Sequence, residues 1–237
     1  WDYIGEPTPY LSSRSSYFGI IDLAGFKKDR FYLYQSEWRP DLPMAHILPH
    51  WNWSGREGEI TPVHVFTSGD EAELFINGQS QGKKKKGPFE YRLRFDDVRY
   101  TPGTVEVVAY KNGKRWATDS VTTSGVPSGL RLSADRNIIN ADGKDLSFVT
   151  VDIVDKKGNP VPTATHRVHF SLTGPGRIVA TDNGDSTNFT PFPSHERKAF
   201  SGKLLVIIQS EHNKPGELKL TASSQALEPA VLTLRAN

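Results

Sequence analysis

A period-two alternation of apolar and polar residues dominates this chain from residue 61 onward, and it favours antiparallel β-structure. Residues 91–95 show it most plainly, because Tyr, Leu and Phe alternate there with arginines. The pairs Asn77-Gly78 and Asn112-Gly113 interrupt the alternation. Asn-Gly is a strong hairpin signal, since both central positions of the tight turn take positive φ. The sequence therefore predicts a mainly β protein built from short, hairpin-connected strands.

A composition break at residues 125–128 (Gly-Val-Pro-Ser) divides the alternating region in two. About six or seven strands before it predict a small sandwich, and about seven after it predict a second one. The second set of expected strands covers residues 129–134, 146–154, 168–172, 177–181, 204–209, 217–223 and 230–234. The second sandwich holds Phe but no Trp or Tyr, so its core differs from that of the first.

Residues 1–53 have a different character, with four Trp, five Tyr and three Phe. Asp29 is a plausible N-cap or first-turn acid for a helix over residues 30–38, which Pro40 ends. So short a segment rarely buries this much aromatic surface alone. We expect it to pack on a partner that precedes it. Without one, it should fold onto the first sandwich or bury its rings in a neighbouring chain, with possible self-association.

Composition narrows the class of partner. The net charge of +2 gives no basic field that would favour nucleic acid. No apolar run approaches the roughly 20 residues of a membrane span. The absence of cysteine excludes disulfides and cysteine-ligated zinc. No motif for a cofactor is present, and none is predicted.

Several polar clusters invite a site, but each has a simpler interpretation. His46 and His50 flank Leu48-Pro49, which disfavours a shared helical face for a metal, so they and Trp51 and Trp53 are better explained by interdomain packing than by a metal or sugar platform. His166 and His169 lie three apart near a strand, on opposite faces.

Two charged groups are interpreted in the same way. The lysines at 83–86 lie beyond a hairpin and before Gly87-Pro88, which favours a solvated loop. Four aspartates could supply calcium oxygens if their loops met, but turn formation is the preferred role. These aspartates are Asp142, Asp145, Asp182 and Asp185. No metal site is predicted.

Specific stretches of residues 1–53 resemble the C-terminal part of a glycoside hydrolase family 2 enzyme of the β-galactosidase type. Trp-Asp-Tyr-Ile-Gly-Glu-Pro-Thr-Pro-Tyr (1–10) and Ser-Tyr-Phe-Gly-Ile-Ile-Asp-Leu-Ala-Gly-Phe (16–26) are similar to the loop after the last strand of that family's catalytic (β/α)8 barrel. Glu-Leu-Phe-Ile-Asn-Gly-Gln-Ser-Gln-Gly (73–82) is similar to a hairpin of its next, immunoglobulin-like domain. Residues 141–145 and 155–161 resemble its last, invasin-like domain.

This resemblance implies three parts: a remnant of the barrel with one helix at 1–47, a first immunoglobulin-like sandwich at 48–125 and a second at 126–237. It implies retaining hydrolysis of a β-glycoside or polysaccharide by two glutamates, a chemistry that needs carboxyls about 5–5.5 Å apart. In the family both lie upstream of anything matching Trp1. We therefore expect no catalytic residue in this chain, an inactive fragment, and a missing barrel that packs on residues 1–53 of a periplasmic or secreted protein.

Trp1, Asp2 and Glu6 are the substrate-binding candidates, because the match places them at the mouth of the barrel, where active sites form. An aromatic plane can stack on the C–H face of a sugar, and a carboxylate can accept hydrogen bonds from hydroxyls. The alternative is that the two acids anchor the loop and Trp1 fills core.

A second function, from a different class, is a carbohydrate-binding or adhesin-like module without chemistry. It is motivated by the invasin-like character of residues 126–237 and by a Trp51 and Trp53 pair that looks exposed.

Overall fold

The computed structural model describes residues 1–4 and 12–237. They form two compact units. The central unit is Lys27–Ser124, and the C-terminal unit combines Trp1–Phe26 with Gly125–Asn237. The chain thus starts in the C-terminal unit, leaves it to build the central unit, and returns at Gly125. The assignment of residues 1–47 to the end of a barrel stays a prediction.

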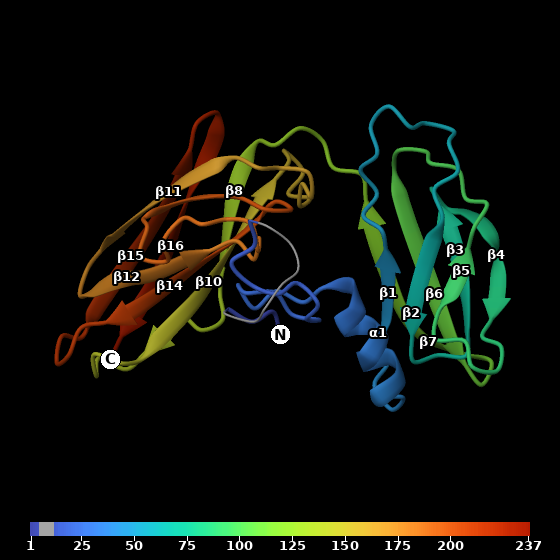
Figure 1. The fold of residues 1–237 in the computed structure, drawn as a ribbon, viewed down its shortest axis with the longest axis horizontal. Helices are drawn as coiled ribbons and strands as arrows, with labels where there is room; N and C mark the ends of the chain where they lie inside the picture. Colours follow the sequence, from blue (N-terminus) through green and yellow to red (C-terminus); the bar gives the residue numbers. More distant parts are fainter. Residues whose placement is uncertain (5–11) are drawn as a thin grey trace. The chain divides into compact units, whose positions relative to one another are not determined.

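The central unit contains one helix and two antiparallel sheets (Figure 1). The helix is α1 (Asp29–Trp38). One sheet has the order β1-β2-β5, and the other has the order β4-β3-β6-β7. The strands are β1 (Ala45–Leu48), β2 (Val63–Thr67), β3 (Glu71–Ile76), β4 (Gln79–Lys85), β5 (Leu93–Phe95), β6 (Thr104–Lys111) and β7 (Lys114–Thr122). Inward-facing residues of both sheets, such as Val65, Leu74 and Val107, are fully buried in one core.

The two Asn-Gly hairpins form as predicted. Asn77 has φ 50° and Gly78 has φ 79° between β3 and β4. Asn112 and Gly113 have φ 52° and 73° between β6 and β7. The helix is confirmed too, with Asp29 in its first turn.

The prediction of a solvated loop at residues 83–86 was wrong for the first three lysines. They lie in β4, where the hairpin register runs on to the pairing of Lys85 with Glu71. Lys83 Nζ lies 2.6 Å from Glu71 Oε2 on the paired strand. Because β4 is at the edge of its sheet, the lysines oppose edge-to-edge pairing with another chain, which is a common reason for lysine on an edge strand.

The C-terminal unit is a sandwich whose strands follow the order β12-β14-β10-β8-β16-β15-β11-β13 (Figure 1). Its strands are β8 (Gly129–Ala134), β9 (Ile138–Ile139), β10 (Leu146–Val154), β11 (Arg167–Thr173), β12 (Gly176–Asp182), β13 (Glu196–Lys198), β14 (Lys203–Ser210), β15 (Gly216–Ser224) and β16 (Leu227–Ala236). Neighbours are antiparallel except that β16 pairs in parallel with β8 and β9. Val149, Val206 and Leu220 are fully buried in its core. The predicted mainly β fold with two sandwiches is confirmed.

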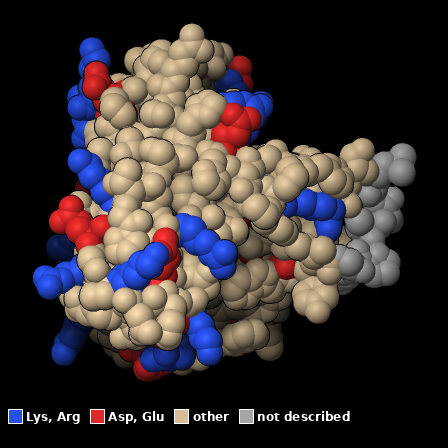
Figure 2. Space-filling view, turned by 90° about the vertical axis from the view of Figure 1, so that its left-hand side faces the viewer, with Lys and Arg blue, Asp and Glu red and all other residues tan. Residues whose placement is uncertain are grey.

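The surface of the molecule carries both signs of charge. In the face shown in Figure 2, Lys and Arg side chains are interspersed with Asp and Glu. Within residues 1–4 and 12–237, no helix has the length and apolar character to cross a bilayer.

Candidate functional site

The N-terminal segment, defined as residues 1–4 and 12–26, forms a small pairing of its own within the C-terminal unit. Ile4 bridges Ser15 in antiparallel fashion. The Ser16 N–H donates to the Tyr3 carbonyl at 3.1 Å, and the Tyr3 N–H donates to Ser16 Oγ at 2.9 Å. Residues 2–4 are therefore held along residues 15–21, and the position of Trp1 follows from this pairing.

Asp2 is buried and ties the start of the segment to its middle. Its Oδ1 accepts a hydrogen bond from the Gly19 N–H at 2.9 Å, and its own N–H donates to the Ile21 carbonyl at 2.8 Å. A Cβ on Gly19 would come within 2.4 Å of the Asp2 nitrogen, so the close approach requires glycine. These hydrogen bonds agree with the alternative in which Asp2 anchors the loop, whereas a contact of Asp2 with substrate stays a prediction. Glu6 lies outside the described residues.

Trp1 leaves most of its indole open. It is 68% exposed, and Tyr3 and Phe18 are 67% and 58% exposed. Phe18 packs against Tyr17 with ring centroids 5.0 Å apart. A Cβ on Gly25 would lie 3.8 Å from Trp1 Cζ2, so the indole rests beside the turn at residues 22–25. A fixed backbone with an open aromatic plane is suited to stacking on the apolar face of a ring.

The Trp51 and Trp53 pair is not the exposed platform that motivated a binding module. Trp51 is 1% exposed, and its indole N–H donates to the Thr101 carbonyl at 2.9 Å. Its ring meets Tyr100 edge-on at 5.1 Å. Trp53 is partly buried against the same core and stacks on His50 at 4.5 Å. Both tryptophans therefore serve the packing of the central unit.

The two histidines of this region point to different partners. His46 stacks on Tyr32 at 3.9 Å, and its Nε2 lies 2.8 Å from Asp29 Oδ1. Burial lowers the pKa of His50 despite the opposing effect of the Asp29 charge. Among the described residues, no group of three or more His, Cys, Asp or Glu side chains could hold a metal ion.

The four candidate calcium aspartates are used in local structure. Asp142 Oδ1 accepts hydrogen bonds from the Lys144 and Asp145 N–H groups at 2.8 and 2.7 Å. Asp185 Oδ1 accepts one from the Thr187 N–H at 2.9 Å. Asp182 Oδ1 accepts hydrogen bonds from the Asn183 and Gly184 N–H groups at 2.6 and 3.0 Å, and it also pairs with Arg14 of the N-terminal segment. Sequence patterns gave no signal for that pair, because the two residues are separated by 168 positions.

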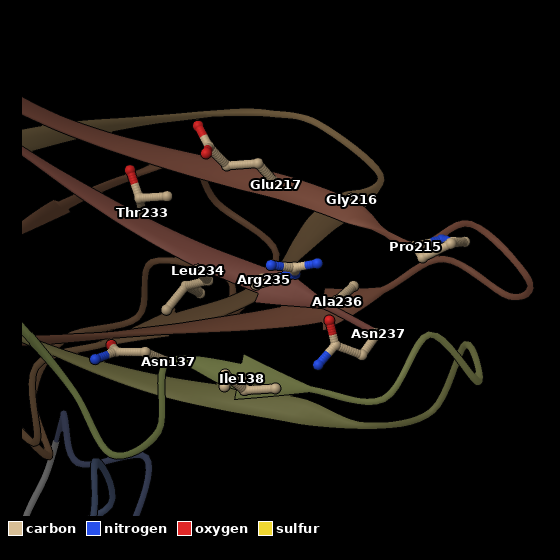
Figure 3. A pocket seen from close by; sticks show the side chains of 10 residues that line it. All are labelled: Asn137, Ile138, Pro215, Gly216, Glu217, Thr233, Leu234, Arg235, Ala236 and Asn237. Carbon is tan, nitrogen blue, oxygen red and sulfur yellow. The ribbon is translucent and has the colours of Figure 1, made fainter.

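An open groove of about 600 Å³ lies where β9, β15 and β16 meet (Figure 3). Glu217 of β15 stands opposite Arg235 of β16 in the strand register, and Ile138 of β9 lines the other side. These side chains are exposed. The groove has mixed apolar and polar walls, and none of its charged lining residues is buried in a way that would fix a ligand.

Comparisons with known proteins match both units. Residues 130–233 match the model for glycoside hydrolase family 2 C-terminal domain 5, and residues 58–117 match a domain of unknown function. A β-galactosidase of Bacteroides ovatus is 49% identical over 237 residues, which is 100% of this chain and 27% of that protein. A putative β-glucuronidase of Formosa agariphila is 35% identical over 197 residues, 81% of this chain and 19% of that protein.

Solved structures of glycoside hydrolases match this chain as well. The crystal structure of a β-glycosidase from Bacteroides vulgatus superimposes with a TM-score of 0.93 at 36% identity, covering 99% of this chain and 30% of that one. The fold and these matches place the chain among the C-terminal regions of glycoside hydrolases. It belongs to glycoside hydrolase family 2. The chain spans about a quarter of the length of the curated β-galactosidase it matches.

Proposed function

We propose that this chain is the accessory C-terminal region of a retaining, β-galactosidase-like hydrolase of β-linked glycans. In this proposal the two catalytic glutamates belong to a barrel outside the chain, which packs on residues 1–53, and the chain alone is inactive. The whole enzyme works in the periplasm or outside the cell. Trp1 forms part of the wall of the substrate site, together with Asp2 and Glu6.

The observation that carries the proposal is the state of Trp1. Trp1 as a whole residue is 68% exposed, yet the next residue in the chain is tied down through the buried carboxylate of Asp2. Leaving a large ring in water forgoes roughly 2 kcal/mol or more of burial, so an exposed ring on an ordered backbone suits a contact made with another molecule. The names of the relatives, β-galactosidase and β-glucuronidase, support the proposed substrate class.

The test is a kinetic comparison of the full-length protein, the 237-residue chain and two variants on chromogenic β-galactoside and β-glucuronide. We expect turnover from the full-length protein only. Trp1→Ala in the full-length protein should lower kcat/KM about 10- to 100-fold, corresponding to the loss of one stacking surface. Tyr91→Ala is the matched control, because Tyr91 is 61% exposed in the central unit, lies outside residues 1–53 and has no proposed role in the site.

Three results would count against the proposal. Turnover by the 237-residue chain would refute the assignment of the catalytic pair to a barrel outside it. A full-length protein inactive on both substrates would refute the activity. Equal kcat/KM for Trp1→Ala and Tyr91→Ala would remove Trp1 from the substrate wall.

A further inference from the structure

A buried ion pair joins the N-terminal segment to the second sandwich. The Arg14 guanidinium donates to Asp182 Oδ1 at 2.8 Å, with the two side chains 11% and 6% exposed. The Arg14 N–H donates to the Ser186 carbonyl at 2.8 Å. Its guanidinium also lies 5.0 Å from the centre of the Phe192 ring. Arg14 is thus held by its backbone, its charge and its planar face.

A second contact lies eight residues further along the segment. The Asp22 carboxylate is so close to Gly184 that a Cβ there would come within 2.1 Å of Asp22 Oδ2. Gly184 has φ 76° and donates its N–H to Asp182 Oδ1 at 3.0 Å. The same turn, residues 182–186, therefore contacts the segment at both Arg14 and Asp22.

The stretch between these two contacts is the one that carries Trp1 and Asp2. Residues 15–21 lie between Arg14 and Asp22, and residues 2–4 pair along them. The Asp2 N–H and Asp2 Oδ1 bond to Ile21 and Gly19 within that stretch. A displacement of Arg14 or Asp22 is therefore transmitted to the indole of Trp1.

A fully buried arginine ties together the chain on either side of this turn. Arg197 on β13 donates to the carbonyls of Thr190 and Pro191 at 2.8 and 2.9 Å, and to the Thr181 carbonyl. Burial lowers the pKa of the Arg197 guanidinium, while the charge of Asp182 opposes that shift. Asp182 therefore interacts with two cations, and the loop after β12 is fixed around them.

The ion pair is poorly suited to a purely stabilising role. Among the described residues, Arg14 Nε and Asp182 Oδ2 are buried without a hydrogen-bond partner. A buried pair with unpaired atoms recovers little of its desolvation cost, so its net contribution to stability is small. What is fixed is geometry, because the guanidinium is held from three directions, by Asp182 Oδ1, the Asp185 carbonyl and the face of the Phe192 ring.

We propose that Arg14 and Asp182 are positioning residues for substrate binding: the last sandwich holds the Trp1 loop in its binding geometry through this pair. The inference rests on the proposed function, because it needs Trp1 to touch the sugar. It assigns the final domain a role in affinity for substrate. Neither residue touches substrate itself, and the chemistry at the catalytic carboxyls is not altered by them.

The test uses the full-length protein with Arg14→Met, which keeps an unbranched apolar stem and removes the charge. Arg14→Lys is the conservative variant. Arg94→Met is the matched control, because Arg94 pairs with Asp96 at 3.0 Å on the surface of the central unit, outside residues 1–53. Two readouts are needed: hydrogen–deuterium exchange of peptides covering residues 12–26, and KM and kcat on the substrate that the wild type cleaves best.

We expect Arg14→Met to speed exchange in residues 12–26 about tenfold and leave residues 27–124 unchanged. KM should rise about five- to tenfold, while kcat should stay within about twofold of the wild-type value. This is the pattern expected when the lost interaction stabilises the bound substrate and the transition state equally. Arg14→Lys should recover most of both effects, and Arg94→Met should show neither.

The outcomes separate the two proposals. If the wild type cleaves no glycoside, the proposed function fails, and the exchange data alone still decide whether the pair holds the segment. If the wild type is active and Arg14→Met speeds exchange without raising KM, the pair is only structural and the positioning role is overturned. If Arg14→Met does not fold, Asp182→Asn takes its place, and wild-type KM and exchange of residues 12–26 in Asp182→Asn overturn the positioning role equally.

Discussion

Asp155 carries a pH-dependent share of the stability of the C-terminal unit, and Asp155→Asn tests it. The side chain is buried at the turn between β10 and residues 159–161. Its Oδ2 accepts hydrogen bonds from the Gly125 N–H at 2.8 Å and from Asn159 Nδ2 at 3.1 Å. Its Oδ1 accepts from the Lys157 and Asn159 N–H groups at 2.8 and 2.9 Å. Four donors therefore converge on one carboxylate.

The magnitude follows from the pKa. Burial raises the pKa of Asp155, but the hydrogen bonds outweigh it and lower the pKa from 3.8 to about 2. Each unit corresponds to about 1.4 kcal/mol, so ionised Asp155 contributes roughly 2 kcal/mol. Because the folded pKa is below the unfolded one, this contribution is complete above pH 5. It is lost as the pH falls through 4 toward 2.

The assay is calorimetric unfolding between pH 7 and 2, with tryptophan fluorescence identifying the transition of the central unit, which holds Trp38, Trp51, Trp53 and Trp116. We expect Asp155→Asn to lower the free energy of unfolding by roughly 2 kcal/mol at pH 7. The NH2 group of the new asparagine is a donor, and it would face backbone N–H groups that are donors too. The gap to wild type should shrink as the pH falls to 2. Lys156→Gln, an exposed change in the same turn, controls for local disturbance. A gap that stays constant with pH would refute the reasoning.

Two further predictions concern packing. Trp51→Ala should destabilise the central unit by about 3–5 kcal/mol, because Trp51 is 1% exposed. Trp38→Ala, at an exposed position, should change the free energy of unfolding by no more than about 0.5 kcal/mol. Urea unfolding followed by fluorescence compares the two variants, and equal losses of stability would contradict the difference in burial. Gly174→Ala should destabilise the C-terminal unit by more than about 2 kcal/mol, since φ is 104° and the new Cβ would meet the Glu217 carbonyl oxygen at 2.0 Å. A calorimetric shift no larger than that of Lys156→Gln would contradict this strain.

Local chemistry made much of the fold predictable. The Asn77-Gly78 and Asn112-Gly113 hairpins were predicted because positive φ at these positions depends on the two residues themselves. The same local reasoning failed at Lys83, because β4 is extended by its register with β3 and not by the composition of its own residues. Strand membership at an edge is decided by the neighbouring strand, which a local pattern does not contain.

The candidate site was predictable only in its local part. Trp1 and Asp2 came from the resemblance of residues 1–10 to a known family, and the structure adds the anchor at Gly19. Proline-rich extended sequence around Trp51 has no period, so nothing in it indicated which rings face the core. The partner of Arg14 could not be found from spacing, because their contact depends on the whole topology between them.

The interrupted chain order of the C-terminal unit affects its biosynthesis. A ribosome adds about 5–20 residues per second, so Asp182 emerges roughly 10–30 s after Arg14, from which it is separated by 168 positions. The whole central unit, Lys27–Ser124, is made in that interval and has its own core to fold around. Throughout it, the Arg14 guanidinium has no Asp182 carboxylate to pair with. Nascent chains arrested in this window therefore carry residues 12–26 without the ion pair that ties them to the second sandwich.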